Sequence, residues 1–240
     1  MVIGDVGSLG TLVGLAAVVV GAVAQAATGM GFSLVVAPCL VAVMGPRDGV
    51  AVTLVLAALS SVAPLWNNRA HVEPRAVARL LVPTLAFTPV VAWAVRDVET
   101  RWLALAGGVG VIGATLLLAG GLRSPWLRRR EAVVVVGAAS AALNVVGGVG
   151  GPPVGLYVAN AGWEPRKARG SLQAFFGVQN LVTALVLGLV LPDPAQLAAL
   201  ALGTAAGLLL SGRTGAATVR AGILAVSLFG GVWLVAGAVG

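Results

Sequence analysis

The residues of this sequence that suit binding chemistry are uncharged, and they gather around two glycine-rich stretches. The stretches are Gly29-Met30-Gly31 and Gly147-Gly148-Val149-Gly150-Gly151. Polar residues close to the two stretches are Gln25, Thr28, Ser33, Ser140, Asn144, Tyr157 and Asn160, and Gln173, Gln179, Asn180 and Thr183 come later in the chain. Amide and hydroxyl groups hold a small solute through hydrogen bonds, without the cost of burying a side-chain charge. The pattern therefore predicts a binding site rather than acid–base catalysis.

The elements that must position these residues are membrane-spanning helices. The 240 residues are 59% hydrophobic and 10% charged, with a mean hydropathy of +1.02, which excludes a soluble enzyme. A span needs roughly 20 apolar residues. Eight segments meet this need, approximately 9–28, 47–66, 75–95, 102–120, 132–149, 170–191, 195–211 and 219–237, and two shorter segments, 32–44 and 152–160, follow the glycine stretches. We predict an all-α integral membrane protein with about eight transmembrane helices plus two half-helices.

The starts of the two half-helices supply the backbone part of the expected site. One begins at Gly31-Phe32 and the other at Gly151-Pro152-Pro153. The first N–H groups of a helix have no partner within it and carry the positive end of its dipole, so they favour anions. Glycine lets an anion approach the backbone closely, and proline in the first turn loses no hydrogen bond. We expect the two helix starts to converge near the membrane midplane, where the side chains of Gln25 and Asn144 add donors.

The two glycine stretches belong to halves of the chain that match at a spacing of 119 residues. Gln25 falls on Asn144, Gly29 on Gly148, Gly31 on Gly150, Pro46 on Pro165, Arg47 on Arg166, Ser61 on Asn180 and Arg101 on Arg220. We predict a first transmembrane repeat at 1–122, a cytoplasmic linker at 123–131 and a second repeat at 132–240. Each half pairs a long helix with a returning half-helix and adds three crossings, so the two repeats have to be inverted.

The basic residues divide unequally between the two sides of this topology. Three, Arg47, Arg96 and Arg101, lie on one side. The other side holds Arg69, Arg75, Arg79, Arg123, Arg128, Arg129, Arg130, Arg166, Lys167, Arg169, Arg213 and Arg220. The positive-inside rule makes the majority side cytoplasmic and places both termini outside the cytoplasm, in a multi-pass protein of the cell (inner) membrane. The net charge of +7 is therefore an orientation signal, and no nucleic-acid partner is expected.

Several other chemistries lack the residues they need. The chain has one histidine and one cysteine, so no multi-histidine or cysteine metal site forms, and no cofactor is expected. All eight carboxylates lie in loops or at helix ends, which gives a buried proton relay no support. The N-terminus has no basic region before its apolar stretch, so we expect the first helix to stay in the mature protein. An open alternative for the polar residues and glycines is helix–helix packing.

Thr28-Gly29-Met30-Gly31-Phe32 in the first half, and Asn144, the run Gly147 to Pro153 and Tyr157 in the second, resemble the TauE/SafE family, also called the toluene sulfonate uptake permeases. The resemblance spans nearly the whole chain. It implies duplicated glycine-rich halves that move sulfur-containing anions, with the two glycine stretches bordering the substrate path. The expected substrate-binding residues are Gln25, Thr28, Gly29, Gly31, Phe32, Ser33, Asn144, Gly148, Gly150, Gly151, Pro152, Pro153, Tyr157, Gln179 and Asn180.

The function we expect is a permease for a small sulfur-containing anion, such as sulfite, sulfoacetate or another organosulfonate, which works by alternating access. Its partners are that organic or inorganic anion and the lipid bilayer, and a homo-oligomer is an open option. One alternative is a ten-segment drug/metabolite-type exporter of a neutral solute. Another is a membrane assembly or sensor protein that transports nothing. The sequence leaves open the identity of the anion, the direction of transport and the driving force.

Overall fold

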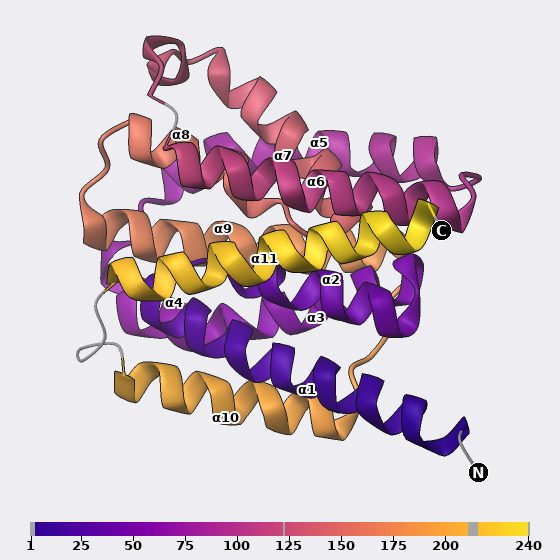
Figure 1. Ribbon diagram of the computed structural model, residues 1–240. Helices are drawn as coiled ribbons and strands as arrows, with labels where there is room; N and C mark the ends of the chain where they lie inside the picture. The colour runs from indigo at the N-terminus through magenta and orange to yellow at the C-terminus, as the bar shows by residue number, and fades with distance from the viewer. Residues whose placement is uncertain (1–2, 122, 211–215, 240) are drawn as a thin grey trace.

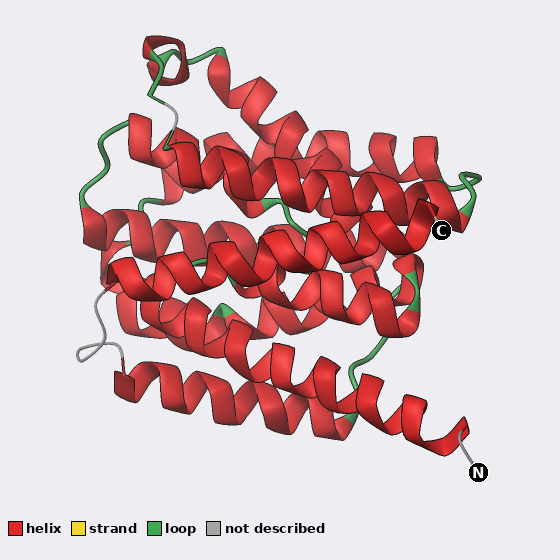
Figure 2. Ribbon diagram, in the orientation of Figure 1, coloured by secondary structure: helices red, strands yellow, loops and turns green. Residues whose placement is uncertain are grey.

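In the computed structural model of the chain, residues 3–121, 123–210 and 216–239 are described, without the side chains of residues 3–8, 28 and 216–220. All regular structure in these ranges is helical (Figure 2). The first half contains α1 (Ile3–Thr28), α2 (Phe32–Met44), α3 (Pro46–Ser60), α4 (Val62–Asn68), the 3-10 turn η1 (Arg69–His71), α5 (Pro74–Val95) and α6 (Thr100–Gly120). The second contains η2 (Pro125–Arg128), α7 (Ala132–Gly147), α8 (Gly151–Asn160), α9 (Pro165–Leu187), α10 (Pro194–Leu210) and α11 (Ala216–Val239).

Six helical segments of the described residues are long and apolar enough to cross a membrane. They are Leu9–Ala27, Pro46–His71, Pro74–Val95, Thr100–Gly120, Pro165–Leu187 and Ala221–Val239. Two segments that we expected to span are shorter apolar helices, α7 and α10. Helix α7 ends after 16 residues because Gly148 takes a left-handed conformation, and 16 residues rise only about 24 Å against a core of about 30 Å. The chain therefore turns back inside the bundle at α7–α8.

Large apolar side chains cover much of the outer surface. Val82 on α5, Leu209 on α10 and Phe229 on α11 are each about 70% exposed, at 69%, 76% and 71%. Soluble proteins do not expose apolar surface on this scale, whereas a lipid-facing bundle must. The all-helical, membrane-embedded class expected from the composition is confirmed.

Helix boundaries in the two halves coincide at the spacing of 119 residues. Helix α1 ends at Thr28 and α7 at Gly147, α3 begins at Pro46 and α9 at Pro165, and α6 ends at Gly120 and α11 at Val239. In both halves proline fixes a helix start and glycine a break, so the same local signals recur at equivalent places.

The packing partners of equivalent helices also correspond. Helix α1 packs on α10, and their equivalents α7 and α5 pack on each other. Helices α6 and α11, which are each other's equivalents, lie side by side and antiparallel (Figure 1), with Arg101 Nε donating to the carbonyl oxygen of Ala238 and Gly108 lying against Gly231. Helix α9 likewise runs antiparallel to its equivalents α3 and α4, with Gly177 against Ser61 and Gly170 against Asn68. In these two cases, equivalent helices thus run in opposite directions.

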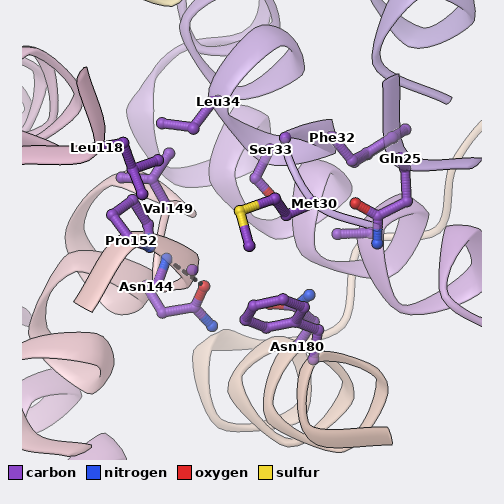
Figure 3. Close-up of a pocket in the computed structure, with 15 residues that line it drawn as sticks. Gln25, Met30, Phe32, Ser33, Leu34, Leu118, Asn144, Val149, Pro152 and Asn180 are labelled. Atoms are coloured by element: carbon purple, nitrogen blue, oxygen red, sulfur yellow. Dashed lines mark hydrogen bonds between the residues drawn. The ribbon is translucent and has the colours of Figure 1, made fainter. Parts of the chain in front are cut away.

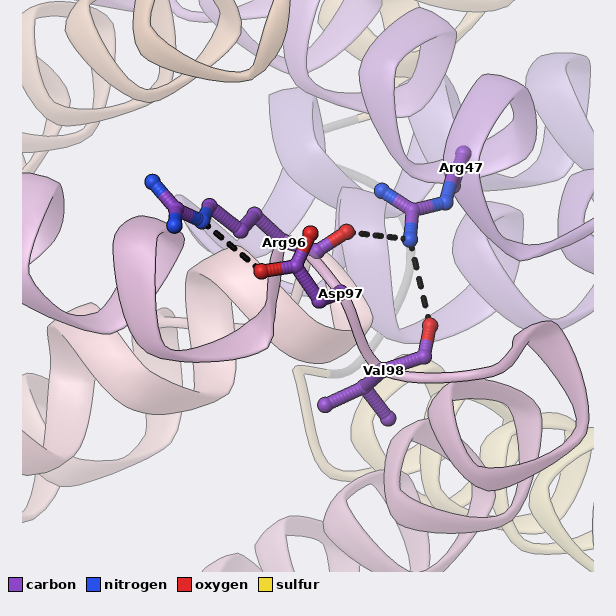
Figure 4. A network of polar contacts seen from close by, with 4 residues as sticks. All are labelled: Arg47, Arg96, Asp97 and Val98. Carbon is purple, nitrogen blue, oxygen red and sulfur yellow. Dashed lines mark hydrogen bonds and ion pairs between the residues drawn. The ribbon is translucent and has the colours of Figure 1, made fainter.

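Arg47 lies at the end of the bundle where α1 begins and α11 ends. Its guanidinium donates to the carbonyl oxygens of Arg96 at 2.8 Å and Val98 at 3.1 Å, at the turn between α5 and α6 (Figure 4). Arg96 in turn pairs with Asp97 at 2.9 Å. Arg47 therefore ties the start of α3 to this turn, a structural role rather than contact with the cavity described below.

Candidate functional site

The two glycine breaks meet at one small cavity inside the bundle. About 40 Å³ of it is space that the centre of a water molecule can reach, enough for a few water molecules or one small oxyanion. Side chains from both halves converge on it (Figure 3). This central cavity is lined by Gln25, Met30, Gly31, Phe32, Ser33, Leu34, Ala57, Leu118, Asn144, Val149, Gly150, Gly151, Pro152, Phe176 and Asn180. None of these lining residues is ionisable.

The start of α2 presents unpaired backbone donors to the central cavity. Gly31 precedes the helix with φ of 109°, a left-handed conformation that glycine adopts without strain, and this turns the chain from the break into α2. The first hydrogen bond of the helix runs from the N–H of Val35 to the oxygen of Gly31 at 3.3 Å. The N–H groups of Phe32, Ser33 and Leu34 have no partner among the described residues, as expected for a first turn. Three donors and a positive dipole end therefore face the cavity.

The start of α8 has fewer free donors. Pro152 and Pro153 occupy its first turn and have no N–H, so Gly151 is the one residue among the first three of the helix that can donate. The N–H of the preceding residue, Gly150, donates to Oδ1 of Asn144 at 3.1 Å. The two half-helix starts are thus equivalent in position but not in chemistry.

A buried polar network fixes the second break to α7 and α9. Nδ2 of Asn144 donates to Oγ1 of Thr183 at 3.1 Å, and Oγ of Ser140 donates to the oxygen of Gly150 at 2.7 Å. Nε2 of Gln179 donates to Oγ of Ser140 at 2.8 Å, while Oε1 of Gln179 has no partner among the described residues. A Cβ atom at Gly150 would lie 2.6 Å from Nε2 of Gln179 and 2.8 Å from the Cβ of Asn144, so this position has room for glycine alone.

Gln25 is held by a second chain of hydrogen bonds. Nε2 of Gln173 donates to the carbonyl oxygen of Gly29 at 2.6 Å, and Nε2 of Gln25 donates to Oε1 of Gln173 at 2.9 Å. The carbonyl of Gly29 can only accept, which sets the orientation of both amides. The amide oxygen of Gln25 consequently faces the central cavity (Figure 3). The Gln25 amide N–H group is thus used to hold the first break in place, and its oxygen cannot donate to a ligand.

Asn180 and Ser33 are the polar side chains that line the cavity without a hydrogen-bond partner among the described residues. Asn180 is 6% exposed and lies on α9, across the cavity from the start of α2. A buried amide is normally paired, because an unpaired one costs about 1–3 kcal/mol. The cavity therefore holds a free amide and a free hydroxyl beside the free N–H groups of α2.

The remaining predicted site residues lie next to the cavity or away from it. Thr28 ends α1, and its side chain is outside the described part of the chain. Gly29 and Gly148 take left-handed conformations in the breaks, Pro153 is buried in α8, and Gln179 lies in the network behind Gly150. Tyr157 lies in a different pocket, where its ring meets that of Trp163 edge-on at 6.5 Å.

The lining residues that we did not predict are apolar. They are Met30, Leu34, Ala57, Leu118, Val149 and Phe176. Met30 and Val149 had a signal, since each stands between two glycines of a break. Leu118, Ala57 and Phe176 come from three other helices and look like ordinary lipid-facing or core residues in the sequence.

A larger cavity, which we call the vestibule, adjoins the central cavity on the side of the bundle where most arginines lie. The centre of a water molecule can reach about 360 Å³ of it. It shares the lining residues Met30, Gly31, Leu34 and Leu118 with the central cavity. Arg123 and Arg169, both exposed, line it too. Cε of Met30 and Cδ2 of Leu118 reach to 3.2 and 3.8 Å from where a Cβ atom of Gly155 would stand. Both side chains line the vestibule and the central cavity, and we call this shared boundary the neck.

Towards the other side of the bundle lies a separate small pocket. The pocket around Arg47, lined by Pro46, Val50, Leu103 and Leu187 among others, has no lining residue in common with the central cavity. Along α3, the buried residues Val52 and Leu56 come between Val50, which lines that pocket, and Ala57, which lines the central cavity. The central cavity thus shares lining residues with the vestibule but not with the pocket around Arg47.

Comparison with known proteins agrees with this architecture. A profile of the family described as Sulfite exporter TauE/SafE matches residues 13–236. No curated protein and no solved structure matches the chain. The match covers nearly the whole chain, both glycine breaks and every lining residue of the central cavity. The protein is a multi-pass membrane transporter that belongs to the TauE/SafE family of sulfite exporters.

Proposed function

We propose that the protein carries sulfite, sulfoacetate or another small organosulfonate across the membrane, and that the anion binds in the central cavity. The observation that carries this proposal is the row of unpaired N–H groups of Phe32, Ser33 and Leu34, which face a cavity without any ionisable lining residue. Donors fixed at a helix start stabilise an anion in a low-dielectric site without bringing a counter-charge. The hydroxyl of Ser33 and the amide of Asn180 complete the set of donors.

The size of the cavity supports a small anionic head group. About 40 Å³ suits a compact oxyanion such as sulfite or the sulfonate group of a longer molecule. The organic part of a sulfonate would have to pass the neck of Met30 and Leu118 and lie in the vestibule, where about 360 Å³ is available. Substrate length therefore depends on the neck rather than on the anion site.

Alternating access is supported by the symmetry of the helix packing. Antiparallel equivalent helices, the shared helix boundaries and the partner pairs α1–α10 and α7–α5 fit two inverted repeats, at 1–122 and 132–240, joined by a linker at 123–131. Two such repeats exchange their conformations when the site changes sides. By the positive-inside rule the vestibule opens to the cytoplasm and both termini lie outside it, in the inner membrane. Arg123 and Arg169 then attract anions at the entry of an exporter.

The test is a flux assay in proteoliposomes made with purified protein. We expect sulfite or a small sulfonate to cross faster than in empty liposomes, and a matched carboxylate and an uncharged solute to cross no faster. Faster flux of the uncharged solute alone would identify a neutral-solute exporter. Absence of any flux, together with no thermal stabilisation by any of the solutes, would favour an assembly or sensor protein, since a bound ligand raises apparent stability by mass action.

A further inference from the structure

A second polar pocket lies on the arginine-rich surface, away from the central cavity. It offers about 330 Å³ and is lined by Glu73, Arg75, Ala76, Arg79, Leu80, Tyr157, Trp163 and Lys167. The lining residues come from α5, α8, α9 and the turns before α5 and α9, and none of them lines the central cavity or the vestibule. We call it the basic surface pocket. The proposed transport path makes no use of it.

Positive charge exceeds negative charge in the basic surface pocket. Arg75, Arg79 and Lys167 stand against the single carboxylate of Glu73, an excess of two positive charges. Lys167 Nζ pairs with Glu73 Oε2 at 2.9 Å, whereas Arg75 and Arg79 have no partner among the described residues. The pKa of Glu73 lies below its usual value, chiefly because of the hydrogen bond and the charge of Lys167, with smaller contributions from Arg75 and Arg79. The carboxylate does not neutralise the pocket.

The aromatic residues of the pocket are typical of the depth of lipid headgroups. Trp163 meets Tyr157 edge-on, and Nζ of Lys167 stands 5.2 Å from the centre of the Trp163 ring. Tryptophan and tyrosine concentrate where the hydrocarbon core of a bilayer meets the headgroups. The pocket is at the end of the long apolar helix α5, whose candidate span begins at Pro74.

An apolar, exposed face of α5 continues from the basic surface pocket towards the membrane interior. Arg75, Arg79, Val82, Ala86 and Val90 follow one another at spacings of three and four residues, which places them on one face of the helix. All five are exposed, Val82 at 69% and Val90 at 57%. A charged group bound between the two arginines would thus have a lipid-facing apolar track directly beneath it.

We propose that the basic surface pocket binds the phosphate group of an anionic phospholipid, held by Arg75, Arg79 and Lys167, with an acyl chain along the Val82 face of α5. The planar guanidinium of arginine matches phosphate oxygens with paired donors, and two arginines one helical turn apart can share one phosphate. Basic pockets between helices on the cytoplasmic side are suited to such headgroups. The same cations would also accept free phosphate, which lacks the contact with α5.

The experiment uses the full chain purified in a neutral detergent and measures lipid affinity by native mass spectrometry and the shift in apparent Tm. Phosphatidylglycerol is the test lipid, phosphatidylcholine the neutral lipid control, and inorganic phosphate the free anion. The variant R75Q/R79Q removes both free arginines. R128Q/R130Q removes two exposed arginines of the linker and is the matched control, because it lowers the charge of the same surface equally.

We expect phosphatidylglycerol to bind the wild type and R128Q/R130Q equally and R75Q/R79Q about 25-fold more weakly, at about fivefold for each arginine. Equal binding to R75Q/R79Q and R128Q/R130Q would overturn the proposal, since it would reflect general surface charge. Equal binding of phosphatidylcholine and phosphatidylglycerol would overturn it as well. Inorganic phosphate that stabilises the wild type where phosphatidylglycerol does not would establish a phosphate site and refute the lipid. None of these outcomes depends on transport of sulfite.

Discussion

The backbone N–H of Gly150 donates a hydrogen bond of 3.1 Å to the side-chain oxygen of Asn144. The bond occupies a backbone donor of the second glycine break within the break's own half of the chain. The prolines at the start of α8 have no N–H, which removes two further donors. The equivalent donors at the start of α2 stay free and face the central cavity. The two half-helix starts are therefore asymmetric, and the proposed anion site would draw most of its backbone donors from α2.

Asn144→Leu should destabilise the protein. The leucine would leave the N–H of Gly150 without its acceptor and Thr183 without its donor, both in buried positions. An unpaired buried polar group costs about 1–3 kcal/mol, so apparent Tm in detergent should fall clearly. Asn68→Ala serves as a control, because among the described residues that side chain bonds the carbonyl oxygen of Pro64 alone, within its own helix turn. An unchanged Tm for Asn144→Leu would mean that the network contributes no stability.

Asn180→Leu should leave stability intact and weaken anion binding. No described group makes a hydrogen bond to the Asn180 amide. Its replacement by a side chain of similar size therefore leaves no buried donor or acceptor without a partner. A hydrogen bond to a charged group contributes about 1.5–3 kcal/mol, which corresponds to about tenfold or more in affinity. Sulfite titration followed by thermal shift measures the affinity, and Tm without sulfite is the control. Wild-type affinity in this variant would remove Asn180 from the site.

Gly150→Ala and Gly151→Ala should differ although the two residues are neighbours. A Cβ atom at Gly150 would lie within 2.8 Å of three atoms, Nε2 of Gln179, Cβ of Asn144 and the oxygen of Ser140. One at Gly151 would meet Phe176 at an ordinary contact of 3.5 Å. Overpacking costs about 1–3 kcal/mol, so Gly150→Ala should lower apparent Tm or yield, and Gly151→Ala should change them little. Equal Tm and yield of the two variants would show that the packing around Gly150 is not as tight as described.

Met30→Ala should raise flux of longer sulfonates relative to sulfite. The change shortens one of the two side chains that form the neck between vestibule and central cavity. The ratio of sulfoacetate to sulfite flux in proteoliposomes is the measurement. Met44→Ala is the matched control, since Met44 is 37% exposed at the far end of α2 and lines none of these cavities. A ratio that rises equally in both variants would deny Met30 a gating role.

Much of the architecture followed from local signals in the sequence. Proline and glycine set the starts of α3 and α9 and the breaks after α1 and α7, which is why helix boundaries were predictable to a few residues. The length of α7 was not, because Val149 continues the apolar run past Gly148, where the backbone turns left-handed. The hydropathy of the sequence gives no sign of that turn.

Many of the residues that line the cavity could be named from the sequence, but the hydrogen bonds and orientations of their side chains could not. Both breaks had to lie inside the protein, because lipid cannot pair their backbone groups. The residues singled out from the sequence that line the central cavity are Gln25, Gly31, Phe32, Ser33, Asn144, Gly150, Gly151, Pro152 and Asn180, and their binding of a substrate stays a prediction. The rotation of a helix about its own axis decides whether Gln179 or Asn180 faces the cavity, and tertiary packing sets that rotation. The bond between Asn144 and Gly150 likewise depends on the fold of the break, which spacing alone does not specify.

Ser33→Pro offers the most direct test that backbone donors of α2 hold the anion. Position 33 is equivalent to Pro152 of the second repeat, where proline is accommodated in the first turn, so the variant should fold. Ser33→Ala removes the hydroxyl alone, whereas Ser33→Pro also removes one N–H. We predict that sulfite affinity, measured by titration of the purified protein, is about tenfold or more weaker in Ser33→Pro than in Ser33→Ala. Equal affinities in two folded variants would contradict an anion site at the start of α2.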